Sequence, residues 1–420
     1  MPPSVLQYYR QTSTTQWRGA NTKNKSKSPK NFSRKNERLD LAKLVIKLDL
    51  MTRIRQSVAV FKANKYVKRH KREKIIALLL LAIIIGSTNT LRETDYKFLL
   101  ALLGDKDTPS RSTISRAMEK INAPLYRLFN EYATMLIRLN REFKARISII
   151  KAAEIAIMDS KGIETKAKIA RVGYINGRKR KGLKIKLVTL ANVPILVFFT
   201  TANENDKNGL EDIIVEIANR LKKRDKLYLV FDKGFFDLKV MAKAYRLGII
   251  VVVPYRSGTR FGTLVCMGWS KRACWWTYLR IINGVKIFLH VVEFPLRNER
   301  WAIVTTSPNA LLAVELYRLR WSIEVIFRHI SDLGFRLLGY SYHAFSVSVL
   351  LYLLALILLK LYAILARRRF SVAELRRKFR RWFEEVWKWW VFHLGLNVDR
   401  PPPVHYLSIS NVVFSPRVGL

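Results

Sequence analysis

The strongest constraint on this chain is an alternation of short apolar runs with amphipathic helical patterns between residues 153 and 254. The apolar runs have the length and β-branched content of strands, and they cover 153–158, 183–191, 195–200, 226–231 and 249–254. Helical patterns with one apolar face fill 209–224 and 238–247. The order β-β-β-α-β-α-β predicts an α/β fold, with a mixed sheet and helices packed against it.

Residues 256–299 interrupt this order with alternating, tryptophan-rich runs. Two of the runs flank Asn283-Gly284, a dipeptide typical of a tight hairpin turn. The core pattern resumes at 301–306, and Ser307-Pro308 opens a helix that we expect to continue to about Ser331. We interpret 256–299 as a β-strand insertion in one α/β domain, whose two parts are 151–255 and 300–366.

The residues before 150 differ in character. Residues 1–40 are polar and rich in lysine, which predicts a flexible basic arm, and 41–150 are helical in pattern. Within them, 108–118 is typical of the second helix of a helix-turn-helix, because Ile114 and Met118 fall on one buried face. A helical DNA-binding domain would then present four polar residues to DNA: Arg111, Ser112, Ser115 and Arg116. An ordinary amphipathic helix is the alternative.

The charge of the chain limits its partners. Lysine and arginine total 76 against 31 acidic residues, for a formal net charge of +45. Nucleic acid is the expected polyanion, and an anionic membrane surface is the alternative. Only two cysteines are present, which excludes a disulfide framework and a cysteine-based zinc site, and indicates an intracellular protein.

One apolar segment, 347–366, is long enough to span a membrane. It directly follows a polar helix with candidate catalytic residues, so we prefer a buried core helix and keep a transmembrane helix as the alternative. The remaining residues, 367–420, form a basic and aromatic tail. Its helix begins with the capping-box pair Ser371 and Glu374.

Two carboxylates follow apolar strand patterns, Asp159 after 153–158 and Asp232 after 226–231. If these strands are neighbours, the carboxylates meet at one sheet edge, where their mutual repulsion favours a bound cation. Oxygen ligands of this kind suit Mg²⁺ or Mn²⁺, and two such ions stabilise the entering and leaving oxygens of phosphoryl transfer. Strand-end aspartates that only cap turns are the alternative.

The helix after the insertion carries the third candidate carboxylate. Tyr317, Arg320 and Glu324 are spaced i, i+3 and i+7, which places them on one helical face. Arg320 and Glu324 form either an ordinary i, i+4 ion pair or a metal-binding carboxylate beside a fork for phosphate.

These residues together resemble a known family, the DDE insertion-sequence transposases, and in particular the cut-and-paste "IS four" branch with a β-strand insertion. Tyr317-x-x-Arg320-x-x-x-Glu324 is similar to its Y-R-E-K signature, and Asp159 and Asp232 match its two aspartates. The resemblance covers about residues 153–366. The position of the signature's final lysine, seven residues after Glu324, is Ser331 here, with Arg328 one turn earlier on nearly the same face.

The resemblance implies a ribonuclease-H-like fold and a DNA transposase. Asp159, Asp232 and Glu324 would hold two Mg²⁺ ions, with Mn²⁺ as substitute, for end cleavage, hairpin formation and strand transfer. Double-stranded DNA, both terminal inverted repeats and target, would be bound by a homodimer in the cytoplasm, at the nucleoid of a bacterium or archaeon, without a membrane. The expected DNA contacts are Tyr317, Arg320, Arg328, Trp301, Arg178, Lys179, Arg180, Lys184 and Lys186.

Two of these implications carry alternatives. Trp301 would stack on a base flipped out of the duplex, or it is a core residue at the start of a strand. The replacement of the signature lysine by Ser331 leaves a catalytically inactive, sequence-specific DNA-binding relative as the alternative function.

Overall fold

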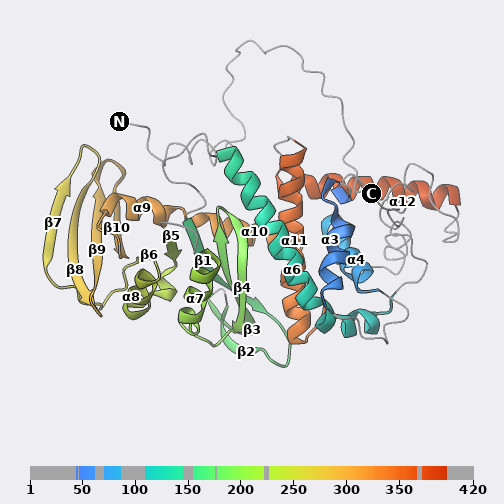
Figure 1. The fold of residues 1–420 in the computed structure, drawn as a ribbon, viewed down its shortest axis with the longest axis horizontal. Helices are drawn as coiled ribbons and strands as arrows, with labels where there is room; N and C mark the ends of the chain where they lie inside the picture. The colour runs from blue at the N-terminus through green and yellow to red at the C-terminus, as the bar shows by residue number, and fades with distance from the viewer. Residues whose placement is uncertain are drawn as a thin grey trace, which may run out of the picture.

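The computed structural model describes residues 44–61, 71–86, 109–144, 155–221, 227–366 and 371–394, apart from residues 46 and 176. A ten-stranded sheet with its helices occupies one side of the molecule, and a group of long helices occupies the other (Figure 1). The predicted basic arm, 1–40, lies outside the described residues.

Five strands form the centre of the sheet, in the order β4-β3-β1-β5-β6. They are β1 (Ile155–Glu164), β3 (Arg178–Leu190), β4 (Val193–Thr201), β5 (Leu227–Phe231) and β6 (Ile249–Pro254). The first three are antiparallel, and β5 and β6 run parallel to β1 after the crossover helices α7 (Leu210–Leu221) and α8 (Leu238–Arg246). This is the ribonuclease-H-like topology, and the predicted α/β fold is confirmed.

The strands differ from the predicted runs where their residues are polar. β1 continues five residues past Asp159, because its second half pairs with β3 while its first half also pairs with β5. β3 begins at Arg178 with four exposed basic residues, and it pairs there with the unpredicted β2 (Arg171–Ile175). Apolar periodicity does not reveal such a solvent-exposed hairpin.

The predicted insertion extends the same sheet. Its strands are β7 (Leu264–Trp269), β8 (Cys274–Ile282) and β9 (Val285–Phe294). They join the core through β10 (Glu299–Thr305), which pairs with β9 on one side and β6 on the other (Figure 1). Asn283 and Gly284 both have positive φ, 50° and 78°, as a primed hairpin turn requires.

The prediction of one helix from Ser307 to Ser331 is wrong, because the structure has two helices in this segment. α9 (Ala310–Arg318) packs on β5, β6 and β10, and α10 (Trp321–Asp332) packs on β1. Between them the N–H groups of Leu319 and Arg320 donate to the carbonyls three residues earlier, at 3.0 and 2.9 Å, which tightens the chain. The apolar periodicity continues across this turn, so it gave no sign of the break.

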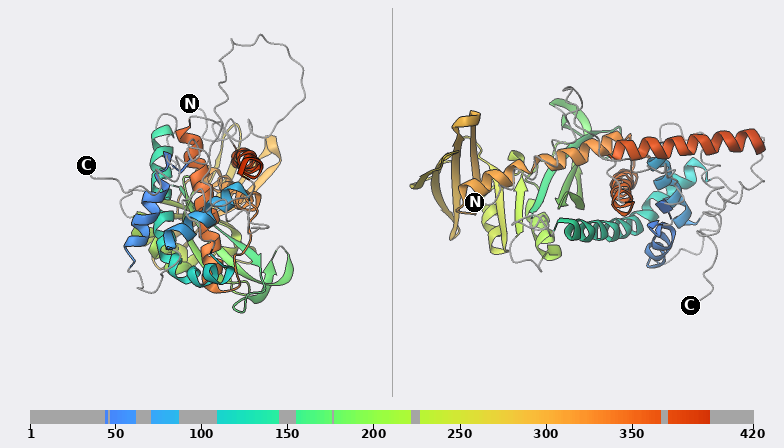
Figure 2. Two further views of the ribbon diagram at one scale, coloured as in Figure 1. Left: turned by 90° about the vertical axis from the view of Figure 1, so that its right-hand side faces the viewer. Right: turned by 90° about the horizontal axis from the view of Figure 1, so that it is seen from above.

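The long helices are α3 (Leu50–Ala59), α4 (Arg72–Ile85), α6 (Arg111–Lys144), α11 (Tyr342–Leu365) and α12 (Val372–Leu394). Figure 2 shows α12 at the end of the molecule opposite the insertion. α11 packs against α4, α6, α12 and β4. It is long and apolar enough to cross a membrane, but 83% of its most apolar window is buried inside the protein, as the core-helix interpretation expects.

The start of α6 agrees with the sequence pattern. Ser110 Oγ accepts from the Thr113 N–H at 3.2 Å, Ile114 and Met118 are buried, and Ser115 and Arg116 are exposed. The helix, however, runs through Pro124 to Lys144. The helix that would precede it in a helix-turn-helix falls outside the described residues, so that motif stays a prediction. The predicted cap of α12 is present, with Glu374 N–H donating to Ser371 Oγ at 3.1 Å.

Candidate active site

The two aspartates lie side by side where the parallel pairing of β1 and β5 ends. Met158 of β1 is in register with Phe231, the last residue of β5. Asp159 follows Met158 within β1, and Asp232 directly follows β5. The Asp159 side chain is 13% exposed and the Asp232 side chain 42% exposed. Asp159 is therefore at the floor of the site, and Asp232 is at its rim.

The third carboxylate, Glu324, contacts the same arginine, Arg320, as the two aspartates. Arg320 lies at the turn between α9 and α10, and Glu324 lies in the first turn of α10. The guanidinium of Arg320 is 3.1 Å from Asp159 Oδ2, 3.8 Å from Asp232 Oδ1 and 2.6 Å from Glu324 Oε1. The i, i+4 pair expected within the helix is present, but it is one side of a cluster in which three carboxylates surround one cation.

Burial and charge determine the protonation of this cluster. Burial raises the pKa of the Asp159 carboxyl to about 6. The Ser160 N–H, 2.7 Å from Asp159 Oδ1, opposes that shift, Asp232 adds to it, Arg320 opposes it and Glu324 adds to it. Burial also acts to lower the pKa of Arg320, but Tyr317 and the three carboxylates outweigh it and raise that pKa.

The donor set suits a hard divalent cation, although its three carboxylates here contact the Arg320 guanidinium. Among the described residues, no three acidic, histidine or cysteine side chains are close enough to hold one metal ion. The positive charge at the centre is instead the Arg320 guanidinium, which already compensates three carboxylates. Carboxylate oxygens are ligands that Mg²⁺ and Mn²⁺ prefer, so a divalent ion and Arg320 compete for the same atoms.

Aromatic side chains lie beside Arg320. The Arg320 guanidinium is 5.8 Å from the centroid of the Tyr317 ring, and Tyr317 meets Trp301 edge to face at 5.9 Å. Trp301 is half-buried on β10, and the Arg318 guanidinium is 5.6 Å from its ring. Trp301 thus connects to the carboxylate cluster through Tyr317, which a core position alone does not require.

The Lys161 side chain extends to Ser331, the position at which the family signature has a lysine. The Lys161 ammonium is 3.4 Å from Ser331 Oγ and 5.6 Å from the centroid of the Phe327 ring. Arg328, which the sequence suggested as a substitute, is on the exposed surface of α10. No pattern in the sequence marked Lys161, because its partner is 170 residues away on another element.

The expected DNA contacts on β3 divide into two groups. Arg178, Lys179 and Arg180 are exposed, and Arg180 is 3.2 Å from Glu164. Lys184 and Lys186 direct their ammonium groups to the loop after β4, and their role as DNA contacts stays a prediction. Lys184 donates to Glu204 O at 2.7 Å, and the fully buried Lys186 donates to Asn208 O at 2.5 Å. The side chain of Arg111 lies outside the described residues.

One acidic residue of the site was missed from the sequence. Asp206, in the loop after β4, accepts from Ser160 Oγ at 2.9 Å and is 3.1 Å from the Lys184 ammonium. It also lies next to the loop after Asp232, since a Cβ on Gly234 would come within 2.9 Å of Asp206 Oδ2. Asp206 thus contacts the segment after Asp159 and lies beside the segment after Asp232. The sequence gave no sign of this role, because the polar loop that carries Asp206 has no apolar periodicity.

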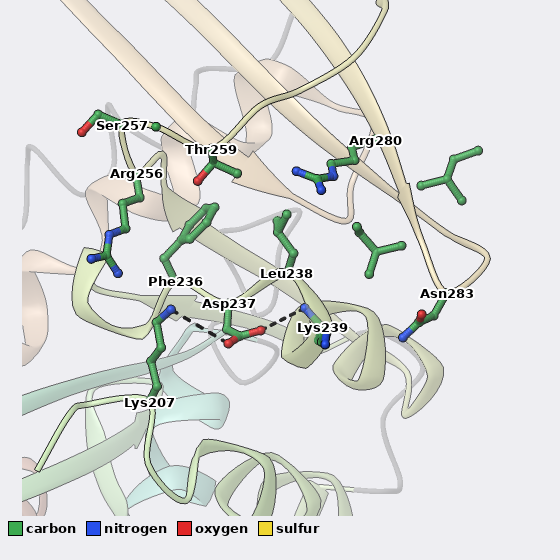
Figure 3. A pocket seen from close by; sticks show the side chains of 13 residues that line it. Lys207, Phe236, Asp237, Leu238, Lys239, Arg256, Ser257, Thr259, Arg280 and Asn283 are labelled. Atoms are coloured by element: carbon green, nitrogen blue, oxygen red, sulfur yellow. Dashed lines mark hydrogen bonds and ion pairs between the residues drawn. The ribbon is translucent and has the colours of Figure 1, made fainter.

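A basic groove of about 840 Å³ begins beside this loop. Its walls carry four cationic side chains: Lys207, Lys239, Arg256 and Arg280. Figure 3 shows Arg256 and Arg280 on opposite sides of the groove and Asp237 at its floor. Asp237 is 3.9 Å from the Lys207 ammonium and caps α8 by accepting from the Lys239 and Val240 N–H groups. The groove joins the core to the insertion, because Arg280 belongs to β8.

A family profile matches a large part of this chain. Residues 151–359 match a family profile described as a transposase DDE domain, and no curated protein matches the chain. A solved structure similar to it is the cryo-EM structure of the piggyBac transposase synaptic complex with hairpin DNA. The TM-score is 0.46 and the identity 10%, over 90% of this chain and 85% of that chain. Residues 151–359 of this chain are therefore similar to the transposase DDE domain.

Proposed function

We propose that this chain is an insertion-sequence transposase of the "IS four" branch, which cuts the ends of its element and joins them to target DNA. The observation that carries the proposal is the convergence of Asp159, Asp232 and Glu324 on the Arg320 guanidinium within a transposase DDE domain. The net charge of +45 supports double-stranded DNA as the partner.

The three carboxylates would act as ligands of divalent metal, Mg²⁺ with Mn²⁺ as substitute and two ions expected. When bound, the metal would activate water and stabilise charge on the scissile phosphate. Arg320 would then turn to a phosphate oxygen, which its planar fork fits. Water would attack the phosphorus and break the bond to O3′, and the freed 3′-hydroxyl would attack the opposite strand, forming a hairpin and releasing the O3′ of the flanking DNA. A second water would then open the hairpin, and the 3′-hydroxyl freed again would attack target DNA.

The remaining surfaces support a path for the DNA. The groove of Figure 3 would hold the backbone beside the cut, and Arg178, Lys179 and Arg180 would contact it on the β2–β3 hairpin. Trp301 would stack on an unpaired base. We propose that Ser112, Ser115, Arg116 and Arg111 contact the terminal repeats, that two copies act on one pair of ends, and that the protein works at the nucleoid in the cytoplasm.

The test is metal-dependent cleavage of the DNA that flanks the coding sequence. The full chain should nick this duplex with Mg²⁺ or Mn²⁺ and not with EDTA. Glu324→Gln should abolish cleavage while the affinity for the same duplex stays within about threefold, because Glu324 is only one of many charges at the surface. Cleavage by the Glu324→Gln variant at the wild-type rate would overturn the assignment.

An inactive DNA-binding relative is the second candidate, and Ser331 in place of the signature lysine is the observation that favours it. That function predicts tight, sequence-dependent binding to the flanking DNA with no cleavage by the wild-type chain in either metal. The same assay therefore separates the two functions.

A further inference from the structure

Lys161 lies on the same side of β1 as the candidate catalytic aspartate. Side chains alternate along a strand, so Asp159 and Lys161, two residues apart, leave the sheet on one face. α10 packs on β1, and its residues Phe327 and Ser331 meet the Lys161 side chain. The ammonium group therefore lies in the seam between β1 and α10, the two elements that carry Asp159 and Glu324.

This ammonium has no acidic partner within the part of the chain that the structure describes. Its contacts are the Ser331 hydroxyl at 3.4 Å, a long hydrogen bond, and the face of the Phe327 ring. The Ser331 hydroxyl itself donates to the Phe327 carbonyl at 3.0 Å. By contrast, Arg320 at the start of α10 compensates three carboxylates. A half-buried cation without a carboxylate is costly unless a ligand supplies the anion.

We propose that Lys161 binds a backbone phosphate adjacent to the scissile one and so positions the DNA strand across the three carboxylates. The inference rests on the proposed transposase function. A strand lying over Asp159 and Glu324 passes the seam in which the ammonium is held, and a phosphate would accept from it as a charge-assisted partner. Arg328, exposed on the outer surface of α10, is not assigned this role.

The test compares Lys161→Met, Lys161→Arg and the control Lys166→Met in the full chain. Methionine keeps an unbranched stem against Phe327 and removes the charge, and Lys166 is an exposed lysine five residues along the chain. The probe is a duplex oligonucleotide that spans one end of the element and its flank. Lys161→Met should reduce the salt slope of binding by about one counterion and single-turnover cleavage by about 10- to 100-fold. Lys161→Arg should restore most of both, and Lys166→Met should cleave like the wild type.

A methylphosphonate scan of the same duplex identifies the contact. Replacing one phosphate near the cut by neutral methylphosphonate should weaken wild-type binding and leave Lys161→Met unaffected. A purely structural lysine would instead lower the unfolding temperature and leave the salt slope unchanged, and that result would overturn the proposal. If the wild type does not cleave at all, the proposed function fails, whereas the salt slope and the scan still decide whether Lys161 binds phosphate.

Discussion

At the scale of single residues, Arg320 holds the site together by compensating three carboxylates that would otherwise repel one another. Arg320→Ala should therefore lower the unfolding temperature in EDTA by several degrees. Added Mg²⁺ should raise the unfolding temperature of the variant more than that of the wild type, because the ion no longer competes with a guanidinium. Scanning fluorimetry over a Mg²⁺ series measures both effects.

The matched control is Arg318→Ala, which removes an arginine that contacts Glu299 instead of the cluster. Its Mg²⁺ response should equal that of the wild type. A Mg²⁺ response of Arg320→Ala that is also equal to the wild type's would contradict competition between Arg320 and the ion.

His329 on α10 gives the protein an acid-sensitive group away from the carboxylates. Burial lowers the pKa of His329 to about 4, with Lys360 and Arg328 acting in the same direction and Asp332 against it. The unfolded chain, with a histidine pKa near 6.5, takes up this proton first as the pH falls. The neutral histidine thus contributes stability above pH 6.5 that is lost between pH 6.5 and 4.

His329→Gln should remove that component of the acid sensitivity, on the order of 2 kcal/mol between pH 6.5 and 4. Urea unfolding of the two proteins at matched pH values measures the difference. Above pH 7, where the histidine is neutral in both states, the difference between the proteins should not vary with pH. If the free energies of unfolding of the two proteins fall in parallel between pH 6.5 and 4, His329 does not cause this part of the acid sensitivity.

The sequence was sufficient for some residues and insufficient for others. Asp159 and Asp232 could be predicted as neighbours because apolar strand runs precede both and parallel strands align their ends. Asp206 and Lys161 could not, since each acts through a partner that the fold brings from a distant segment. The burial of Lys186 could not be predicted, because composition does not say which way a lysine on a strand points.

At the scale of helices and strands, apolar periodicity predicted the core elements but not the polar hairpin or the turn between α9 and α10. The strands β4, β5 and β6 and the helices α7 and α8 follow from apolar spacing because each buries one face. The polar hairpin β2–β3 and the turn at Arg320 do not, since neither changes the apolar pattern. That turn places Arg320 among the three carboxylates, so the geometry of the site depends on a turn that apolar periodicity does not predict.

The basic groove joins two of these elements, the insertion strand β8 and the segment before α8. Arg256→Ser with Arg280→Ser should weaken binding to flanking duplex by about tenfold or more at moderate salt, because two phosphate contacts are lost. The control is Arg127→Ser with Arg138→Ser, which removes two exposed arginines of α6. Fluorescence anisotropy measures both, and equal losses in the two double variants would remove the groove from the DNA path.

At the scale of the whole molecule, the charge of +45 dominates association with DNA. Binding to duplex should follow counterion release, with the affinity falling by roughly 10³-fold or more between 50 and 200 mM salt. An anisotropy titration at four salt concentrations gives the slope. A slope near zero would mean that the charge serves another partner.

The central claim is that Asp159, Asp232 and Glu324 form one divalent-cation site, and Mn²⁺ binding followed by electron paramagnetic resonance tests it most directly. The full chain with flanking duplex should bind Mn²⁺, and Asp159→Asn, Asp232→Asn and Glu324→Gln should each weaken that binding by about tenfold or more. Asp206→Asn, which alters a neighbouring carboxylate outside the set, should weaken it less. Mn²⁺ binding that is unchanged in all three variants would contradict the account.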